Sequence, residues 1–275
     1  MAATSTQRGV TPMRPAPRKT LPWPVQFYRS AVGRKWVMGL TGLMLIGFVV
    51  VHMLGNFKAY LGPEDINEYG EALRDLGGHL VPRTHLLWAM RIGLIGAFAL
   101  HIHAALSLQR MSRKASPKVS IDGAKKYEGS QDFIAANFAS RTMRWTGPII
   151  ILYVFYHLAD LTWGWWLGDD FIRGNPYHNL SESLSSLPVA IIYIVANVAL
   201  AVHIFHGTWS ALQSIGINNP RINAVRKPMS AGLAALILVG NLSFPIMVQA
   251  GVLDSENATH ESAPAALVIS QEVAS

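Results

Sequence analysis

The chain has 275 residues, of which 51% are hydrophobic and only 14% are charged. Because a soluble domain carries about 25% charged residues, this composition favours lipid as the solvent. The chain has no cysteine, which excludes disulfides, a catalytic thiol and thiolate ligands of its own. A net charge of +7 raises nucleic acid as a partner, but the distribution of the basic residues, described below, favours membrane topology instead.

The expected fold class is all-α, an integral membrane bundle of five transmembrane helices. Residues 1–35 are rich in Pro, Arg and Lys and predict a cytoplasmic arm without a helix. Five apolar runs then reach the length of about 20 residues that a bilayer crossing requires. Within a transmembrane domain of 36–253 they predict helices at 36–54, 84–108, 145–167, 188–212 and 229–253, with a short surface helix within 58–70 and an external disordered tail at 254–275.

Lys and Arg residues set the orientation of these helices. Of the 23 in the chain, eighteen fall in the arm and in the second and fourth connections between helices. We therefore predict a multi-pass protein of the inner (plasma) membrane, with a cytoplasmic amino terminus and an external carboxyl terminus. Nucleic acid is not expected as a partner.

Apart from His85 near the start of the second span, six histidines fall inside the predicted spans: His52, His101, His103, His157, His203 and His206. Polar groups in hydrocarbon are costly, so they normally face the bundle interior and have a function there. Counting at about 1.5 Å per residue places His52 and His157 in the outer half and His101 and His203 nearer the inner half. Each pair comes from two helices at similar depth, which suits the two axial ligands of a haem b.

Other interpretations of these residues stay open. Some of the histidines would serve only as hydrogen-bonding partners between helices. A [2Fe–2S] cluster with two His ligands would need cysteines from a partner protein. Only one of His101 and His103 can serve a given centre, because residues two apart point to nearly opposite faces, whereas His203 and His206 share a face. Arg91 is expected to bind a haem propionate or a quinone, to reach the interface, or to pair with Asp160.

Several segments together resemble the five-helix cytochrome b membrane subunit of succinate dehydrogenase and fumarate reductase, respiratory complex II. The resemblance runs across residues 30–250, and no single piece is specific alone. The segments that carry it are Gly33–Gly42, His52–Asn56, Asn67–Tyr69, His101–Ile102, Thr142–Gly147, His157–Leu158 and His203–Ser210.

The resemblance implies that the haem ligands are His52, His101, His157 and His203, with His103 and His206 as alternates beside the inner pair. It implies one or two haem b groups, a flavoprotein partner that oxidises succinate, an iron–sulfur partner, and a quinone substrate, which we expect to be menaquinone. A higher oligomer of the complex also stays open. Expected inner quinone contacts are Tyr28, Ser30, Arg34, Trp36 and Trp209, and an outer quinone or propionate site would use Asn67, Glu71 and Arg91.

Two other functions are alternatives to this one. A haem-bearing subunit of the nitrate reductase or b561 type would share paired histidines, but its motifs are not seen. A proton-coupled transporter would use the histidines and Asp160 as a relay. Transporters usually carry internal repeats or helices broken near the midplane, and no repeat is evident.

Overall fold

A computed structural model describes residues 21–115, 134–217 and 219–254, and these residues form helices and no strand. The elements are α1 (Trp23–Arg29), α2 (Ala31–Asn56), η1 (Phe57–Tyr60), α3 (Pro63–Arg74), α4 (His85–Ala115), α5 (Ile134–Leu161), η2 (Gly168–Asp170), α6 (Pro176–Ser185), α7 (Leu187–Ser214) and α8 (Pro220–Gln249). The first 20 residues of the predicted arm and all but the first residue of the predicted tail lie outside the described residues.

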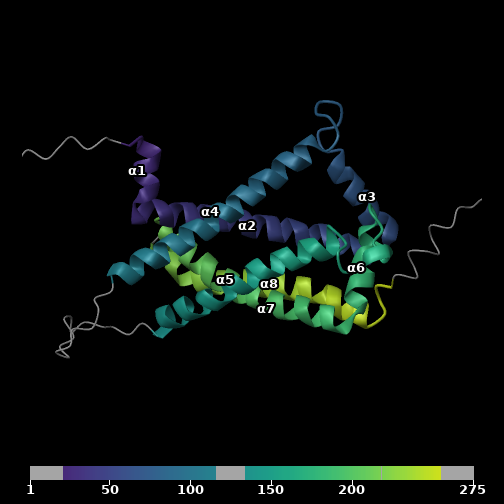
Figure 1. Ribbon diagram of the computed structural model, residues 1–275. Helices are drawn as coiled ribbons and strands as arrows, with labels where there is room; N and C mark the ends of the chain where they lie inside the picture. Colours follow the sequence, from purple (N-terminus) through teal and green to yellow (C-terminus); the bar gives the residue numbers. More distant parts are fainter. Residues whose placement is uncertain (1–20, 116–133, 218, 255–275) are drawn as a thin grey trace, which may run out of the picture.

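The long helices form an elongated bundle in which successive helices run in opposite directions (Figure 1). Helix α7 packs against α8, α5 and α2, and α4 crosses α2 obliquely. Helix α1 lies at one end of the bundle, and α3 and α6 lie at the other (Figure 1).

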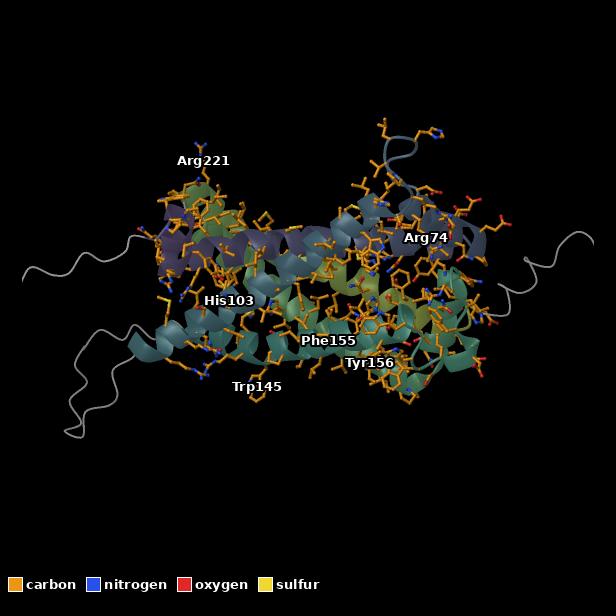
Figure 2. The ribbon with its side chains drawn as sticks, turned by 45° about the horizontal axis from the view of Figure 1, so that its top comes forward. Arg74, His103, Trp145, Phe155, Tyr156 and Arg221 are labelled. Atoms are coloured by element: carbon orange, nitrogen blue, oxygen red, sulfur yellow. The ribbon has the colours of Figure 1, made fainter. Side chains whose placement is uncertain are left out.

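The two ends differ in charge. We call the end where α2, α5 and α8 begin the basic end, because its described residues include many Lys and Arg and no Asp or Glu. We call the opposite end, with α3, α6 and their connections, the acidic end, because it holds Glu64, Asp65, Glu68, Asp169 and Asp170. Figure 2 shows His103 and Arg221 toward the basic end and Arg74 toward the acidic end.

Within the described residues, four helices are long and apolar enough to cross a membrane, at Ala31–Tyr60, His85–Arg113, Leu187–Ser214 and Pro220–Gln249. The chain is therefore a multi-pass membrane protein. The predicted span at 145–167 is not among the four. Its helix, α5, is long enough, but His157 and Asp160 interrupt the apolar run that follows Arg144.

The amino-terminal boundary of the first span was predicted five residues too late. Helix α2 begins at Ala31 because the Ser30 side chain caps it, accepting a hydrogen bond from the Gly33 amide at 2.9 Å. Residues Trp23–Arg29, predicted as part of an irregular arm, form the separate helix α1. Hydropathy misses both features because neither depends on a long apolar run.

Helix α5 ends at Leu161 rather than at the predicted residue 167. Gly164 has a φ of +68°, in the left-handed region that terminates helices, and its amide donates to the Asp160 carbonyl at 3.1 Å. A Cβ at this position would lie 2.3 Å from the Phe171 ring. The exposed residues Trp163 and Trp165 therefore lie in a turn, where aromatic side chains suit a membrane interface.

Two further helices differ from the predictions. Helix α8 begins at Pro220 rather than near residue 229, because the Asn219 side chain accepts from the Ile222 amide at 2.9 Å and Pro220 suits the first turn. Helix α6, which no apolar run predicted, is capped in the same way by Asn175. The surface helix expected within 58–70 is present as α3, which extends to Arg74.

A hydrophobic core lies at the acidic end, where η1, α3, α6, α7 and α8 meet. Tyr193 of α7 and Phe244 of α8 belong to it, together with Leu184 of α6, which is fully buried. Closer to the middle of the bundle, Gly240 of α8 lets Met53 of α2 approach so closely that a Cβ would lie 2.3 Å from its sulfur. These contacts fix α2 against α8 next to His52.

Candidate functional site

The structure brings His52 of α2 and His157 of α5 together near the acidic end. Their ring centres lie 5.9 Å apart with the ring planes at 83°. Two imidazoles that bind one metal ion from opposite sides, each at about 2 Å, have ring centres about 6 Å apart. We call His52 and His157 the acidic-end pair.

A second pair forms closer to the basic end of the bundle, from His101 of α4 and His203 of α7. These ring centres lie 6.3 Å apart, with an interplanar angle of 66°. This spacing also suits one metal ion between two imidazoles. We call His101 and His203 the basic-end pair. Both partnerships agree with the pairs that depth counting predicted from the sequence.

The two pairs are separated along the bundle axis. Gly42 of α2 lies beside His101, since a Cβ there would be 3.1 Å from the imidazole Cε1. His52 follows Gly42 by ten positions on the same helix, which corresponds to about 15 Å at the rise of an α-helix. The bundle therefore holds two bis-imidazole arrangements at two depths.

Three of the four histidines use Nδ1 to contact an oxygen. His101 Nδ1 lies 3.0 Å from the Met38 carbonyl oxygen, and His203 Nδ1 lies 3.2 Å from Thr146 Oγ1. Because a carbonyl only accepts, His101 donates from Nδ1. The Thr146 hydroxyl already donates to the Thr142 carbonyl, so its oxygen accepts from His203.

His157 is held in the same way, since its Nδ1 lies 3.3 Å from the Tyr193 hydroxyl. A proton on Nδ1 leaves the lone pair of Nε2 free, which is the form in which histidine binds a metal. The contacts thus leave Nε2 of His101, His157 and His203 able to bind a metal.

His52 is held differently. Its ring stacks on Phe48 with centres 5.4 Å apart, and its Nε2 lies 3.4 Å from the Asn56 side-chain nitrogen. It is exposed on the surface of the bundle although it lies inside a membrane span. An imidazole facing bare hydrocarbon is unfavourable, so a group bound against this face would stabilise it.

The alternates His103 and His206 have other surroundings. The Nδ1 atom of His103 lies 2.5 Å from the Tyr28 hydroxyl, and the two rings stack with centres 5.8 Å apart. This contact ties α4 to α1 at the basic end. His206 is only 5% exposed and packs against Phe205 at 4.8 Å between ring centres. The ring that meets His101 is that of His203.

The residues expected at an inner quinone site fall into separate groups at the basic end. Tyr28 of α1 contacts His103, and Arg34 of α2 donates to the Met111 sulfur at 2.7 Å. Both contacts link these helices to α4. The Ser30 hydroxyl is used twice, as the cap of α2 and as a donor to the Phe27 carbonyl at 2.6 Å.

The two tryptophans of this expected site have different surroundings. Trp36 lies on the exposed surface of α2. Trp209 of α7 packs beneath the cationic groups of Arg226 and Lys227, whose charged atoms lie 5.9 and 5.8 Å from its ring. Trp209 therefore joins α7 to the first turns of α8.

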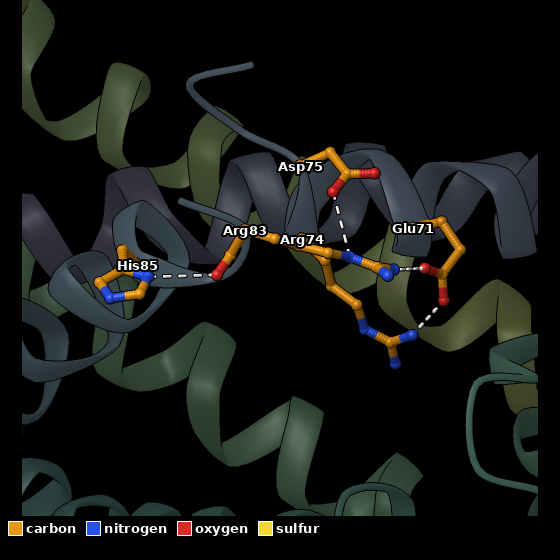
Figure 3. A network of polar contacts seen from close by, with 5 residues as sticks. All are labelled: Glu71, Arg74, Asp75, Arg83 and His85. Carbon is orange, nitrogen blue, oxygen red and sulfur yellow. Dashed lines mark hydrogen bonds and ion pairs between the residues drawn. The ribbon is translucent and has the colours of Figure 1, made fainter. Parts of the chain in front are cut away.

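The residues expected at an outer site take part in contacts of the acidic end. Glu71 forms ion pairs with Arg74 and Arg83 (Figure 3). Arg83 also pairs with Asp75 at 3.0 Å. Asn67 bridges α3 and α6, donating to Asn175 Oδ1 at 3.1 Å. Figure 3 also shows His85 beside the Arg83 carbonyl, at 3.2 Å.

Arg91 does not pair with Asp160, the partner that one interpretation of the sequence gave it. Its guanidinium carbon lies 5.2 Å from the Trp88 ring centre on the exposed surface of α4. Asp160 is only 1% exposed, and its Oδ2 accepts from Ser183 at 2.5 Å and from Tyr193 at 2.8 Å. Ser183 and Tyr193 are site residues that the sequence did not predict. The sequence does hold one indication of this site: Asp160 follows His157 by three positions, which places both on one face of α5.

Among the described residues, no cluster of three or more His, Asp, Glu or Cys side chains is arranged to hold a metal ion. A protein-held zinc or non-haem iron needs three or four such ligands. A haem needs only axial ligands, because the macrocycle supplies the other four nitrogens. The donor set therefore fits a haem b at each pair better than a bare metal ion.

Comparisons with protein-family models, with curated proteins and with solved structures found no match. The class of protein follows from the fold itself: an all-α, multi-pass membrane protein.

Proposed function

We propose that the chain is the membrane-anchor subunit of succinate dehydrogenase, in which it passes electrons to a quinone. The observation that carries the proposal is the pairing of four intramembrane histidines into two cross-helix pairs, with ring centres 5.9 and 6.3 Å apart. The chain oxidises no succinate itself, and a flavoprotein partner performs that reaction. An iron–sulfur partner delivers the electrons.

In this proposal α5 is the fifth membrane span, because it lies alongside α7 in the bundle and contributes His157 to the acidic-end pair (Figure 1). The basic end faces the cytoplasm, which agrees with the distribution of Lys and Arg. That end also offers the soluble partners a cationic surface around Arg34, Arg110 and Arg221.

Each pair supports the proposal through the chemistry of its own residues. When bound there, haem b would supply a carrier for one electron at a time. His52 and His157 would hold one haem, and His101 and His203 would hold the other. The Met38 carbonyl, the Thr146 hydroxyl and the Tyr193 hydroxyl keep Nδ1 protonated and Nε2 available. The quinone, for which we propose menaquinone, would meet the chain at the basic end near Tyr28, Arg34 and Trp209.

Purification of the tagged chain from its native membrane, with whatever partners accompany it, tests this function. We expect a flavoprotein and a cysteine-rich iron–sulfur protein to co-purify, a b-type α-band after dithionite reduction, and succinate:quinone activity. His157→Ala should lose one haem and most of that activity. His178→Ala, which changes a histidine of α6 outside both pairs, should change neither.

Different results identify the competing functions. A b-type spectrum without the flavoprotein would favour a haem subunit of the nitrate reductase or b561 type. A missing α-band, together with an electron paramagnetic resonance signal of a His-ligated [2Fe–2S] cluster, would replace haem by a cluster that shares the partner's cysteines. Proton-coupled solute uptake without either redox signal would contradict the proposal altogether.

A further inference from the structure

A buried carboxylate lies behind the acidic-end pair. Asp160 of α5 is 1% exposed, and no ion pair of the described residues involves it. Its Oδ2 instead accepts hydrogen bonds from the Ser183 hydroxyl at 2.5 Å and the Tyr193 hydroxyl at 2.8 Å. A carboxylate that is buried without an ionic partner is unfavourable, so its presence here needs an explanation.

Tyr193 connects this carboxylate to His157. Its hydroxyl oxygen lies 2.8 Å from Asp160 Oδ2 and 3.3 Å from His157 Nδ1. A phenol carries one proton, and a carboxylate only accepts, so Tyr193 donates that proton to Asp160. The phenol oxygen then accepts from His157 Nδ1–H. The direction of both hydrogen bonds is therefore fixed by Asp160.

The surrounding rings hold Tyr193 in this position. The Tyr153 ring meets that of Tyr193 edge-on, with centres 5.3 Å apart, and also lies 5.7 Å from the His157 ring. The Asn197 side chain donates to the Tyr193 carbonyl at 2.8 Å, which fixes the helix turn from which the ring projects.

Among the residues that the structure describes, no carboxylate contacts the basic-end pair. Its Nδ1 atoms donate to the Met38 carbonyl and the Thr146 hydroxyl, which are neutral acceptors. A carboxylate behind a ligating histidine makes that imidazole a more basic ligand than a neutral acceptor does. A more basic ligand stabilises the oxidised metal, so the two pairs would differ in reduction potential.

We propose that Asp160 is a positioning residue that acts through Tyr193 to fix the tautomer of His157 and to lower the reduction potential of the centre held by the acidic-end pair. The inference rests on the proposed function, because it takes His157 as a haem ligand. It adds that Asp160 and Tyr193 act as one unit on one of the two centres.

Redox titration of the whole purified complex tests this inference. We compare Asp160→Asn, Tyr193→Phe and the double variant with the parent, following the α-band, the haem content and the electron paramagnetic resonance of the oxidised haems. Asp160→Asn should raise the potential of one haem by about 59 mV, a tenfold change for a one-electron couple. Tyr193→Phe should move the same haem in the same direction, and the double variant should move it no further than the larger single shift.

Two variants serve as controls. Tyr153→Phe keeps the ring that packs on His157 and Tyr193 and should leave both potentials unchanged. Thr146→Val removes the acceptor at His203 and should affect only the other haem. If Asp160→Asn fails to assemble, the haem potential of Tyr193→Phe, which removes a single oxygen atom, tests the inference alone.

The outcomes separate the inference from the function beneath it. A complex with full haem content and unshifted potentials in Tyr193→Phe, or with additive shifts in the double variant, would overturn the role of Asp160 and leave the proposed function standing. A parent complex without b-type haem would overturn both.

Discussion

At the scale of single residues, the histidines differ by what their nitrogen atoms contact. Those of the two pairs place one imidazole opposite another on a different helix, whereas His103 contacts a phenol and His206 packs on Phe205. Similar side chains only two or three positions apart can thus have separate roles. This difference leads to a direct comparison on α7.

Under the proposed function, His203→Ala should lose the haem of the basic-end pair, because its ring is the one that lies 6.3 Å from His101. His206→Ala should keep both haems and lose stability instead, by about 2 kcal/mol, as expected for a truncated buried side chain. The haem-to-protein ratio from a pyridine haemochrome spectrum checks both. If the two variants exchange these results, His206 is the ligand and the pairing is wrong.

A second prediction uses the glycines of α2. Gly42→Ala would place a Cβ 3.1 Å from His101 Cε1 and 3.4 Å from its Nδ1, so the imidazole must shift from its present position. We expect a lower content of the basic-end haem and an altered resonance spectrum of that centre.

Gly47→Ala is the matched control on the same helix, since nothing lies within 4 Å of the place that a Cβ would take there. Alanine there should be neutral or stabilise the helix by up to about 1 kcal/mol. Equal haem loss in the two variants would mean that the close approach at Gly42 is unimportant.

The sequence predicts the histidine pairs well because their depth depends only on helical rise, which is constant. It does not reveal Tyr193 as part of the site. A tyrosine in an apolar run is usually a packing residue, and its hydroxyl finds Asp160 and His157 only after α5 and α7 come together. The acceptors of the inner histidines, a carbonyl at Met38 and a hydroxyl at Thr146, are hidden for the same reason.

At the scale of the helices, hydropathy locates the apolar middle of each span but not its ends. Helices α2 and α8 begin before their apolar runs because Ser30 and Asn219 cap them. Helix α5 stops early because Gly164 adopts a left-handed conformation within an apolar, Trp-rich segment. Helix ends depend on local hydrogen bonds, and a hydropathy average over about 19 residues does not detect them.

Ser30 gives a prediction at this scale, because its sequence context predicts a quinone contact whereas the structure uses it as a helix cap. Ser30→Ala should reduce stability by about 1 kcal/mol, and Ser30→Asn should restore it, since asparagine is an equally good cap. Thermal denaturation of the purified complex measures stability, and the KM for quinone measures binding. A raised KM that Ser30→Asn fails to restore would favour a direct contact with quinone instead.

At the scale of the whole molecule, the orientation and the number of spans remain linked. Among the described residues, four helices meet the length and apolarity of a span, and α5 is the fifth candidate. With the amino terminus in the cytoplasm, as we propose, a membrane-crossing α5 means that α4 and α7 both end on the cytoplasmic side and that α8 begins there. If α5 does not cross, α7 must run the other way, and residue 221 must lie outside.

The absence of cysteine from the whole chain makes this choice measurable with single introduced thiols. We expect Asp75→Cys and Asp169→Cys at the acidic end to react with a membrane-impermeant maleimide in intact cells. Arg221→Cys, at the basic end (Figure 2), should react only after the membrane is permeabilised. Labelling of Arg221→Cys in intact cells together with Asp75→Cys would remove α5 as a span, and with it the membrane position of His157 on which the acidic-end centre depends.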